Sequence, residues 1–209
     1  LGFALERSQL EKQALDARLK LLHAQIEPHF LFNTLANVQA LVESGSPQAS
    51  AVLTSLIAYL RAAMPRLADE RATLGDELAL VRAYLELMRM RMPDRLQYEI
   101  EVPDDLRRLR FPGMALLTLV ENAIRHGIDP AEQGGRIELR ARRDGDGTLT
   151  LSVADTGAGL REGAPPGTGL ANLRERLAMF YGAAARLEIA ENVPCGVVVT
   201  VHCPVEADS

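Results

Sequence analysis

The segment LVENAIRHG, residues 119–127, carries an amide, a carboxylate and an imidazole on a stretch with helical periodicity. On such a helix Thr118, Asn122 and His126 are four residues apart and share one face. The amide oxygen of Asn122 is the type of ligand that Mg²⁺ prefers, and Glu121 beside it can accept a proton or hold a metal-bound water. Taken alone, the segment is also compatible with a partly exposed helix whose polar side chains are merely solvated.

A second cluster, DTGAG at residues 155–159, directly follows an apolar segment with strand alternation. Gly157 and Gly159 allow the backbone to approach a bound molecule closely and to adopt a positive φ. The carboxylate of Asp155, at the end of the strand, can accept a charge-assisted hydrogen bond from an exocyclic amine such as that of adenine. The alternative is a glycine-rich turn without a ligand.

The third cluster is GTGLANLRERL, residues 167–177. Gly167 and Gly169 stand at the start of an expected helix, and helix N-termini present N–H groups that suit a phosphate. Thr168 can instead be an ordinary N-cap. The cluster is not a P-loop, because no Gly-Lys-Ser/Thr follows, and it is not a dinucleotide fingerprint, because it does not directly follow a strand.

A fourth cluster, QIEPHFLFN at residues 25–33, lies in the first half of the chain on a long expected helix. Pro28 interrupts that helix beside His29, whose neutral imidazole nitrogen can act as a nucleophile. Asn33 is four residues later, on the same face. The neighbours Phe30 and Phe32 are expected to anchor the segment in a helical core. Without other signals, a solvated helix histidine would be the simpler interpretation.

The first three clusters, taken in order, resemble the N, G1 and G2 boxes of the ATPase fold shared by histidine kinases, gyrase, the ninety-kilodalton heat-shock chaperone and MutL. The resemblance covers roughly residues 95–205 and implies that the chain binds ATP with Mg²⁺. It implies Asn122 as the Mg²⁺ ligand and Asp155 as the residue that reads adenine. In this sequence Val197 follows Gly196, where relatives commonly carry Thr. The residues implied for ATP binding are Asn122, His126, Asp155, Gly157, Gly159, Gly167, Thr168, Gly169 and Leu170.

The fourth cluster resembles the phosphoacceptor box of LytS/YehU-type sensor histidine kinases, and residues 28–33 match PHFLFN in full. Position 27, often Asn in that group, is Glu here. The resemblance implies autophosphorylation of His29 by ATP, followed by transfer of the phosphoryl group to an aspartate of a response regulator. In that reading Asn33 and Glu121 are the further catalytic candidates.

Two helices with apolar stripes are expected in the first half. Leu15, Leu19, Leu22 and Ile26 form a seam of the coiled-coil type, which Pro28 interrupts. A second helix over residues 48–64 follows a turn at residues 44–47. Because two antiparallel helices cannot bury both stripes alone, pairing of two chains into a four-helix bundle is predicted, and the chain is expected to be a homodimer. Beyond Pro28 the stripe resumes through Phe32, Leu35, Val38 and Val42, and the second helix presents Val52, Leu56 and Ala63.

The second half alternates strands and helices. Helices are predicted at residues 74–91, 113–127 and 168–181, and strands at 96–102, 136–142, 148–154, 186–190 and 196–203. This pattern favours an α/β sandwich with helices on one face of a sheet. The predicted organisation is a dimerisation and phosphotransfer region (1–70), a connecting helix (71–94) and an ATP-binding domain (95–209).

Composition limits the alternatives. The formal net charge of -5 argues against a nucleic-acid partner, and the two cysteines do not form a disulfide framework. No signal peptide or run of about 20 apolar residues is visible, and the chain begins at Leu1. We therefore expect the cytoplasmic portion of an inner-membrane protein, with a membrane-anchored sensor segment upstream of this chain.

Two other functions fit the ATPase fold alone. One is a nucleotide-binding interaction module that holds a partner without phosphotransfer. The other is an ATP-driven clamp, which needs a carboxylate that activates water and large additional domains. The PHFLFN segment discriminates against the interaction module, because such a module has no use for it.

Overall fold

The structure, a computed structural model, describes residues 28–63, 72–159 and 168–205. The chain divides into two compact units, Leu1–Ala68 and Asp69–Ser209. The predicted leucine seam at residues 15–26, as well as Glu27, lies outside the described residues. For His29 and Pro28 the structure describes the helical backbone but not the side chain.

The described part of the first unit is a helical hairpin of α2 (Pro28–Glu43) and α3 (Gln48–Ala63). The turn between the helices is closed by the backbone N–H of Ser46, which donates to the carbonyl of Leu41 at 2.8 Å. Phe30 packs edge-on against Tyr59 of α3, with ring centroids 5.6 Å apart. The predicted face of Val52, Leu56 and Ala63 is buried, as the sequence indicated.

The apolar residues of α2 differ in their burial. Phe30 and Val38 are buried against α3, but Phe32 is 68% exposed, and Leu35 and Val42 are also exposed. The expectation that Phe30 and Phe32 both lie in a core is thus met within one chain by Phe30 only. The physical reason is geometric, because residues two apart on a helix face different directions.

The second unit is an α/β sandwich. Its elements are α4 (Leu74–Arg91), β1 (Leu96–Glu101), η2 (Asp104–Arg108), α5 (Ala115–Asn122), η3 (Ala123–Ile128), β2 (Gly135–Arg143), β3 (Thr148–Asp155), α6 (Thr168–Tyr181), η4 (Gly182–Ala184), β4 (Arg186–Glu191) and β5 (Val197–Pro204).

The five strands form one mixed sheet in the order β1-β2-β3-β5-β4. β1 pairs with β2 in parallel, and all other neighbours are antiparallel. The parallel pair is possible because η2, α5 and η3 lie between β1 and β2 in the chain and form the crossover connection.

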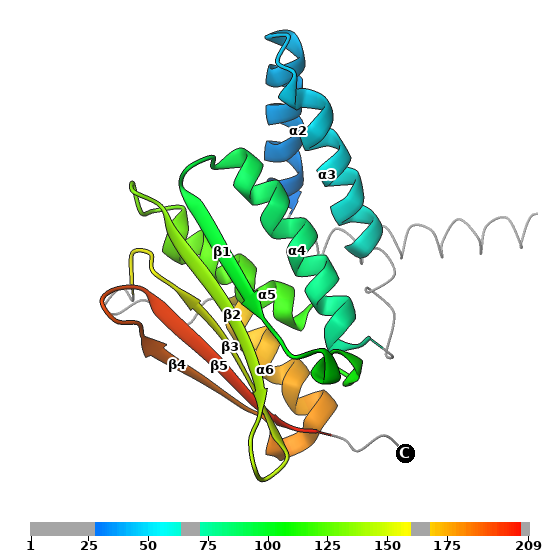
Figure 1. Cartoon of the computed structure of the whole chain (residues 1–209), viewed down its shortest axis with the longest axis vertical. Coiled ribbons are helices and arrows are strands. Elements are labelled where there is room, and N and C mark those ends of the chain that lie inside the picture. Colours follow the sequence, from blue (N-terminus) through cyan, green and yellow to red (C-terminus); the bar gives the residue numbers. More distant parts are fainter. Residues whose placement is uncertain (1–27, 64–71, 160–167, 206–209) are drawn as a thin grey trace, which may run out of the picture. The chain divides into compact units, whose positions relative to one another are not determined.

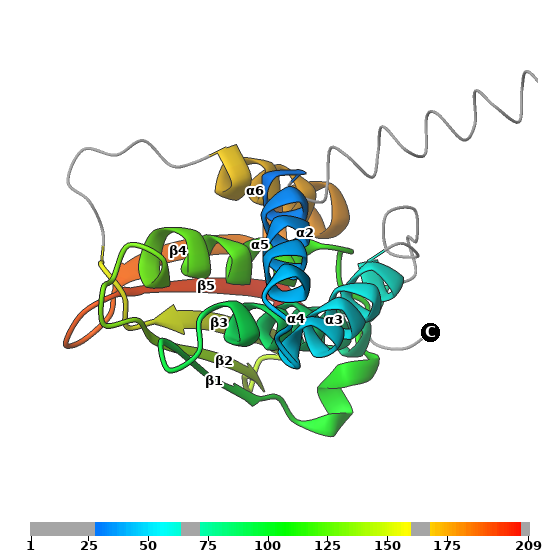
Figure 2. The same ribbon diagram turned by 90° about the horizontal axis from the view of Figure 1, so that it is seen from above.

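Helices α4, α5 and α6 all lie on one side of this sheet (Figures 1 and 2). Strand alternation sends one set of side chains toward them. Those buried in β2, β3 and β5 are Ile137, Leu139, Ala141, Leu149, Leu151, Val153, Val199, Val201 and Cys203. The α/β sandwich with helices on one face, which the sequence predicts, is confirmed.

Helix α4 packs within the second unit. It begins with a capping box in which the hydroxyl of Thr73 accepts from the backbone N–H of Asp76 and the carboxylate of Asp76 accepts from that of Thr73. The predicted apolar face of Leu78, Val81, Leu85 and Met88 is buried. Among the described residues, no helix has the length and apolarity needed to cross a membrane.

Candidate functional site

Asp155 occupies the last inward-facing position of β3. The positions before it on that face are Leu149, Leu151 and Val153, so the two-residue period of the strand places a carboxylate where a core residue would otherwise stand. Asp155 is only 3% exposed, and its Oδ1 accepts a hydrogen bond of 2.9 Å from the backbone N–H of Gly157. The carboxylate is therefore held in a fixed orientation on the helix side of the sheet.

Burial raises the pKa of the Asp155 carboxyl, because desolvation disfavours the charged form. Hydrogen bonds from the backbone of Gly157 and Val197 lower the same pKa and partly offset the burial. A carboxylate in this state gains from an additional donor, and the exocyclic amine of adenine is such a donor.

The end of the first cluster meets the second cluster through backbone contact. The backbone N–H of Ala158 donates to the carbonyl of Gly127 at 3.0 Å. A Cβ atom at Gly157 would overlap the carbonyl of Gly127, and one at Gly127 would overlap the carboxyl of Asp155. These two glycines are needed for the close approach, so the first two clusters form one site.

Gly157→Ala is expected to weaken both the site and the fold. The added methyl group meets backbone atoms of Gly127, which cannot rotate away, and overpacking of this kind costs about 1–3 kcal/mol. Thermal unfolding should show a lower midpoint, and an ATP titration a weaker affinity. Gly145→Ala is the matched control, because nothing lies within 4 Å of the added atom. If both variants behaved alike, close approach at Gly157 would not be required.

The β4–β5 turn closes the site from another side. The side chain of Asn192 donates from Nδ2 to the backbone carbonyl of Asp155 at 2.8 Å. Gly196 has a φ of +102°, and a Cβ there would overlap the same carbonyl. Val197, which replaces the Thr common in relatives, contributes its backbone rather than a hydroxyl toward Asp155. The side chain of Asn192, which the sequence analysis did not identify, thus fixes the backbone of Asp155.

The helix predicted over residues 113–127 has two parts. α5 ends at Asn122, and η3, a π-helical turn, continues to Ile128, with the N–H of Asp129 donating to the carbonyl of Ile124 at 2.8 Å. Asn122 and Glu121 are half-buried and His126 is exposed. The predicted core-facing residues Leu116, Val120 and Ala123 are buried. Wide turns of this type often occur at functional sites, and this one carries the residues from Ala123 to Gly127 toward Asp155.

The start of α6 lies close to α5, so the third cluster is near the first. A Cβ at Gly169 would lie 3.8 Å from Cγ2 of Thr118, one helical turn before Asn122. Leu170 is buried, and Arg176 further along α6 donates to the carbonyl of Gly113 at 2.9 Å. Residues 160–166 and Gly167, which join the second cluster to the third, lie outside the described residues, as does the side chain of Thr168. Gly159, at the end of the second cluster, has a φ of +78°.

The geometry of these clusters suits a nucleotide with its metal ion. The glycines keep an approach to Asp155 free of side chains, and α6 begins beside the face of Asn122. No group of three or more His, Cys, Asp or Glu side chains suited to a metal occurs among the described residues. A single amide oxygen fits Mg²⁺ rather than a tightly bound structural metal, because Mg²⁺ takes its other oxygens from phosphates and water.

Two charged residues next to this site were not predicted. Glu77 on α4 is a carboxylate on an otherwise apolar face, and the backbone N–H groups of Met114 and Leu116 donate to it. Arg95 donates to carbonyls at the end of η3. Glu77 could have been identified from the sequence, because its charge falls on the same helix face as the apolar Val81 and Tyr84. No sequence pattern distinguishes Arg95.

In the first unit, the acceptor candidate lies in α2. His29 stands in the first turn of that helix, and Asn33, four residues on, is exposed. Their spacing is helical, as predicted.

Two protein families match this chain. Residues 17–96 match the family described as histidine kinase, and residues 109–207 match the histidine kinase-, DNA gyrase B- and HSP90-like ATPase family. The first match ends at Leu96, the first residue of β1, although α4 belongs to the second compact unit.

Curated relatives of known name are similar over most of the chain. Sensor histidine kinase BtsS of Escherichia coli K12 is 38% identical over 178 residues, which cover 82% of this chain and 31% of BtsS. Sensor protein LytS of Staphylococcus haemolyticus is 34% identical over 217 residues, which cover 98% of this chain and 36% of LytS. The chain thus spans about a third of the length of these relatives.

Solved structures share the fold. The histidine kinase domain of the blue-light-activated kinase of Erythrobacter litoralis EL346 has a TM-score of 0.54 at 17% identity, covering 92% of this chain and 93% of that domain. The catalytic domain of histidine kinase ThkA has a TM-score of 0.51 at 17% identity, covering 65% of this chain and 96% of that domain. Residues 17–96 thus belong to the histidine kinase family and residues 109–207 to the histidine kinase-, DNA gyrase B- and HSP90-like ATPase family, and the chain is similar to LytS over nearly its whole length.

Proposed function

We propose that this chain is the catalytic part of a two-component sensor kinase, which uses ATP to phosphorylate His29 and then transfers the phosphoryl group to an aspartate of a response regulator. The observation that carries the proposal is the contact of Gly127 with Asp155 and Gly157, which unites the first two clusters in a nucleotide site. The PHFLFN segment on α2 supplies the acceptor.

The proposed roles follow from the chemistry of each side chain. Asp155 accepts from the adenine amine, and Asn122 binds Mg²⁺. His126 contacts the phosphates. The remaining nucleotide contacts come from the backbone at Gly157, Gly159, Gly167, Thr168 and Gly169, with Leu170 packing beneath them.

In the transfer step, a neutral ring nitrogen of His29 donates its lone pair to the γ-phosphorus. The N–P bond forms, the bond from phosphorus to the bridging oxygen breaks, and ADP takes that electron pair. Glu121 is the candidate to accept the released proton or to hold a metal-bound water, and Asn33 to position the phosphoryl group. Mg²⁺ held by Asn122 would supply charge neutralisation on the phosphates. In the second step the N–P bond breaks as the aspartate carboxylate forms an O–P bond.

The test is incubation of the chain with γ-labelled ATP and Mg²⁺. Phosphohistidine is a phosphoramidate, so the label should be lost in acid and retained in base. A label stable in acid would indicate a serine or threonine ester, and no label at all would favour the nucleotide-binding interaction module.

The relatives are about three times longer than this chain, so its partners are part of the proposal. We infer that an upstream sensor segment anchored in the inner membrane controls these domains from outside the chain. The domains themselves then act in the cytoplasm, on a response regulator, and bind no nucleic acid.

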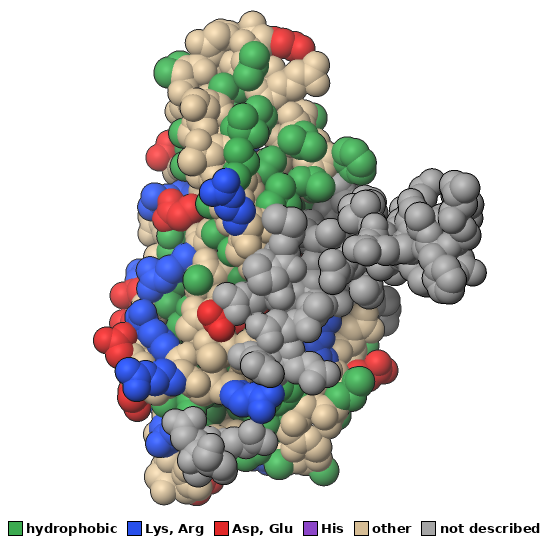
Figure 3. All heavy atoms as spheres, turned by 90° about the vertical axis from the view of Figure 1, so that its right-hand side faces the viewer, with side chains coloured by type: hydrophobic (Ala, Val, Ile, Leu, Met, Phe, Trp, Pro, Cys, Tyr) green, Lys and Arg blue, Asp and Glu red, His purple; other side chains and the backbone are tan. Residues whose placement is uncertain are grey.

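We also propose that residues 1–70 pair with a second copy of the chain and that residues 95–209 bind ATP. Residues 71–94 contain the helix that connects these two regions. The hairpin supports pairing because it exposes a second set of apolar side chains (Figure 3). Those on α2 and α3 are Phe32, Leu35, Val42, Leu53 and Ile57. A contiguous apolar surface of this type marks an interface, and a four-helix bundle would cover it.

The chain is expected to form a homodimer with a mass of about twice 22.8 kDa by light scattering at micromolar concentration. Phe32→Asp should shift it to the monomer, because the aspartate would bury a charge in the bundle. Met179→Asp is the control, since Met179 is similarly exposed but lies on α6 of the second unit. A monomeric parent chain, or a dimer untouched by Phe32→Asp, would contradict this interface.

A further inference from the structure

The helix that carries Glu121 and Asn122 has no N-cap side chain of its own. Met114, at its N-cap position, has a φ of 64° and makes no side-chain capping bond. The missing acceptor comes from α4, where Oε1 of Glu77 accepts from the N–H of Met114 at 2.8 Å and Oε2 accepts from that of Leu116 at 3.0 Å. Glu77 is fully buried, so both oxygens of a desolvated carboxylate are committed to this helix end.

The other end of the same helix is held by a charge of the opposite sign. Nη2 of Arg95 donates to the carbonyl of Ala131 at 2.8 Å and to that of Asp129 at 3.2 Å, with the carbonyl of Ile128 at 3.5 Å. A helix carries a partial positive charge at its start and a partial negative charge at its end. Glu77 and Arg95 therefore complement both ends of the segment from Ala115 to Ile128.

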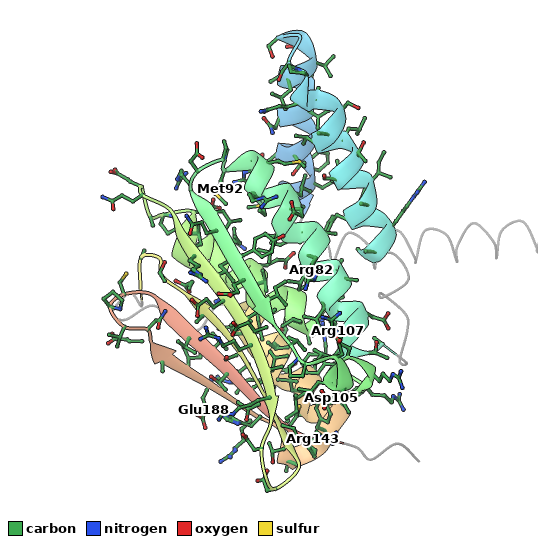
Figure 4. All side chains as sticks on the ribbon, in the orientation of Figure 1. Arg82, Met92, Asp105, Arg107, Arg143 and Glu188 are labelled. Atoms are coloured by element: carbon green, nitrogen blue, oxygen red, sulfur yellow. The ribbon has the colours of Figure 1, made fainter. Side chains whose placement is uncertain are left out.

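Both charged residues come from one continuous stretch of chain, α4 and the turn before β1. Figure 4 marks Met92 near the end of α4 and Arg107 beside its start. The start of α4 packs closely against η2, because a Cβ at Gly75 would lie 3.0 Å from the carbonyl of Arg107. The two bonded ends require α4 and the α5–η3 segment to run in the same direction.

We propose that Glu77 and Arg95 are positioning residues that set the place of the metal-binding Asn122, so that α4 acts as a rigid frame for the nucleotide site. The inference rests on the proposed function, in which Asn122 binds Mg²⁺. A displacement of α4 relative to α5 would reach Asn122 through the bonds of Glu77 to Met114 and Leu116. The frame thereby gives the kinase a control point within the ATP-binding unit.

The test is calorimetric titration of the full chain with ADP at a series of Mg²⁺ concentrations. Glu77→Gln keeps one acceptor but presents an amide N–H₂ to the second N–H, so the Mg²⁺ concentration for half-maximal binding should rise about ten-fold. Asn122→Ala should shift the midpoint in the same direction. A variant that only lowers the folded fraction reduces the amplitude of binding and leaves this midpoint in place.

Two controls lie on the same helix. Asp76→Asn weakens the cap of α4 itself, and Glu86→Gln makes the same chemical change at a residue that pairs with Arg89. Neither should move the Mg²⁺ midpoint. Amide hydrogen exchange without any nucleotide gives a second readout, because residues 115–128 should exchange faster in Glu77→Gln and not in Asp76→Asn.

The outcomes separate the two proposals. If Asn122→Ala moves the midpoint and Glu77→Gln does not, the frame is wrong and the nucleotide site stands. If Asn122→Ala has no effect, the metal assignment and the frame fall together. If Glu77→Gln does not fold, Arg95→Lys decides, because it keeps the charge but loses the Nη2 group that donates to the three carbonyls. A raised midpoint there supports the frame, and an unchanged one overturns it.

Discussion

His29→Gln is expected to abolish labelling of the chain by γ-labelled ATP and to leave its affinity for ATP unchanged. The reason for the loss is that a glutamine amide has no nucleophilic ring nitrogen to accept the phosphoryl group. The reason for the unchanged affinity is that Asp155 and the glycines near it belong to the other compact unit. Quantifying acid-labile phosphate beside an ATP titration measures both quantities on one preparation.

His23→Gln provides the matched control, because it makes the same change six residues earlier in the chain. It should label at the rate of the parent chain. Acid-labile phosphate that persists in His29→Gln would rule out this acceptor. Loss of label in both variants would point to damage of the helix rather than to the loss of a nucleophile.

Asp155→Asn is expected to weaken ATP binding by at least about ten-fold, because a hydrogen bond to a charged group contributes about 1.5–3 kcal/mol. The parent chain should also discriminate against GTP, since guanine presents an oxygen where adenine presents its amine. Calorimetry with both nucleotides measures the two effects. Equal affinity of the parent chain for ATP and GTP would eliminate the adenine-reading role.

The same substitution should make the protein without nucleotide more stable at neutral pH. Burial raises the pKa of Asp155 above its value in the unfolded chain, so this carboxyl favours folding when protonated. That contribution is complete below the unfolded pKa and is lost as the pH rises through the folded pKa. Asn carries no charge to desolvate, so the midpoint of thermal unfolding should rise at pH 7 and the gain should shrink in acid.

Asp144→Asn is the control for both measurements. Hydrogen bonds from Thr150 and Arg142 lower the pKa of Asp144, so its shift has the opposite sign, and it lies on the β2–β3 turn. It should leave ATP affinity unchanged and should not raise the unfolding midpoint. A lower midpoint of thermal unfolding in Asp155→Asn would show that the charged carboxylate stabilises the fold. That result would contradict the predicted cost of burying this carboxylate.

Much of the second unit could be predicted because its periodicity changes clearly along the chain. The helices at 74–91 and 168–181 match α4 and α6, and the five predicted strands match β1 to β5 within one residue at each end. Asp155 was predictable because it ends an apolar strand and precedes two glycines. Only the resemblance to a known fold, however, gave these motifs a common site.

Other features depend on contacts that no local pattern records. The π-helical turn after Asn122 ends with Gly127 against Asp155 and Gly157, and those partners are about 30 residues further along the chain. The capping of α5 by Glu77 is similarly non-local. Phe32 and Phe30 were indistinguishable by residue type, and only the hairpin geometry separates the exposed ring from the buried one.

The packing of α4 has a practical consequence for anyone who exchanges modules between kinases of this type. The family matches suggest a cut near Leu96. A chimera joined there would take its α4 from one parent and the strands beneath it from another. It would mismatch the apolar side chains of Leu78, Val81, Leu85 and Met88 with a foreign surface. A junction before Thr73 keeps helix, cap and sheet from the same parent, so fusions made there should retain a native catalytic module.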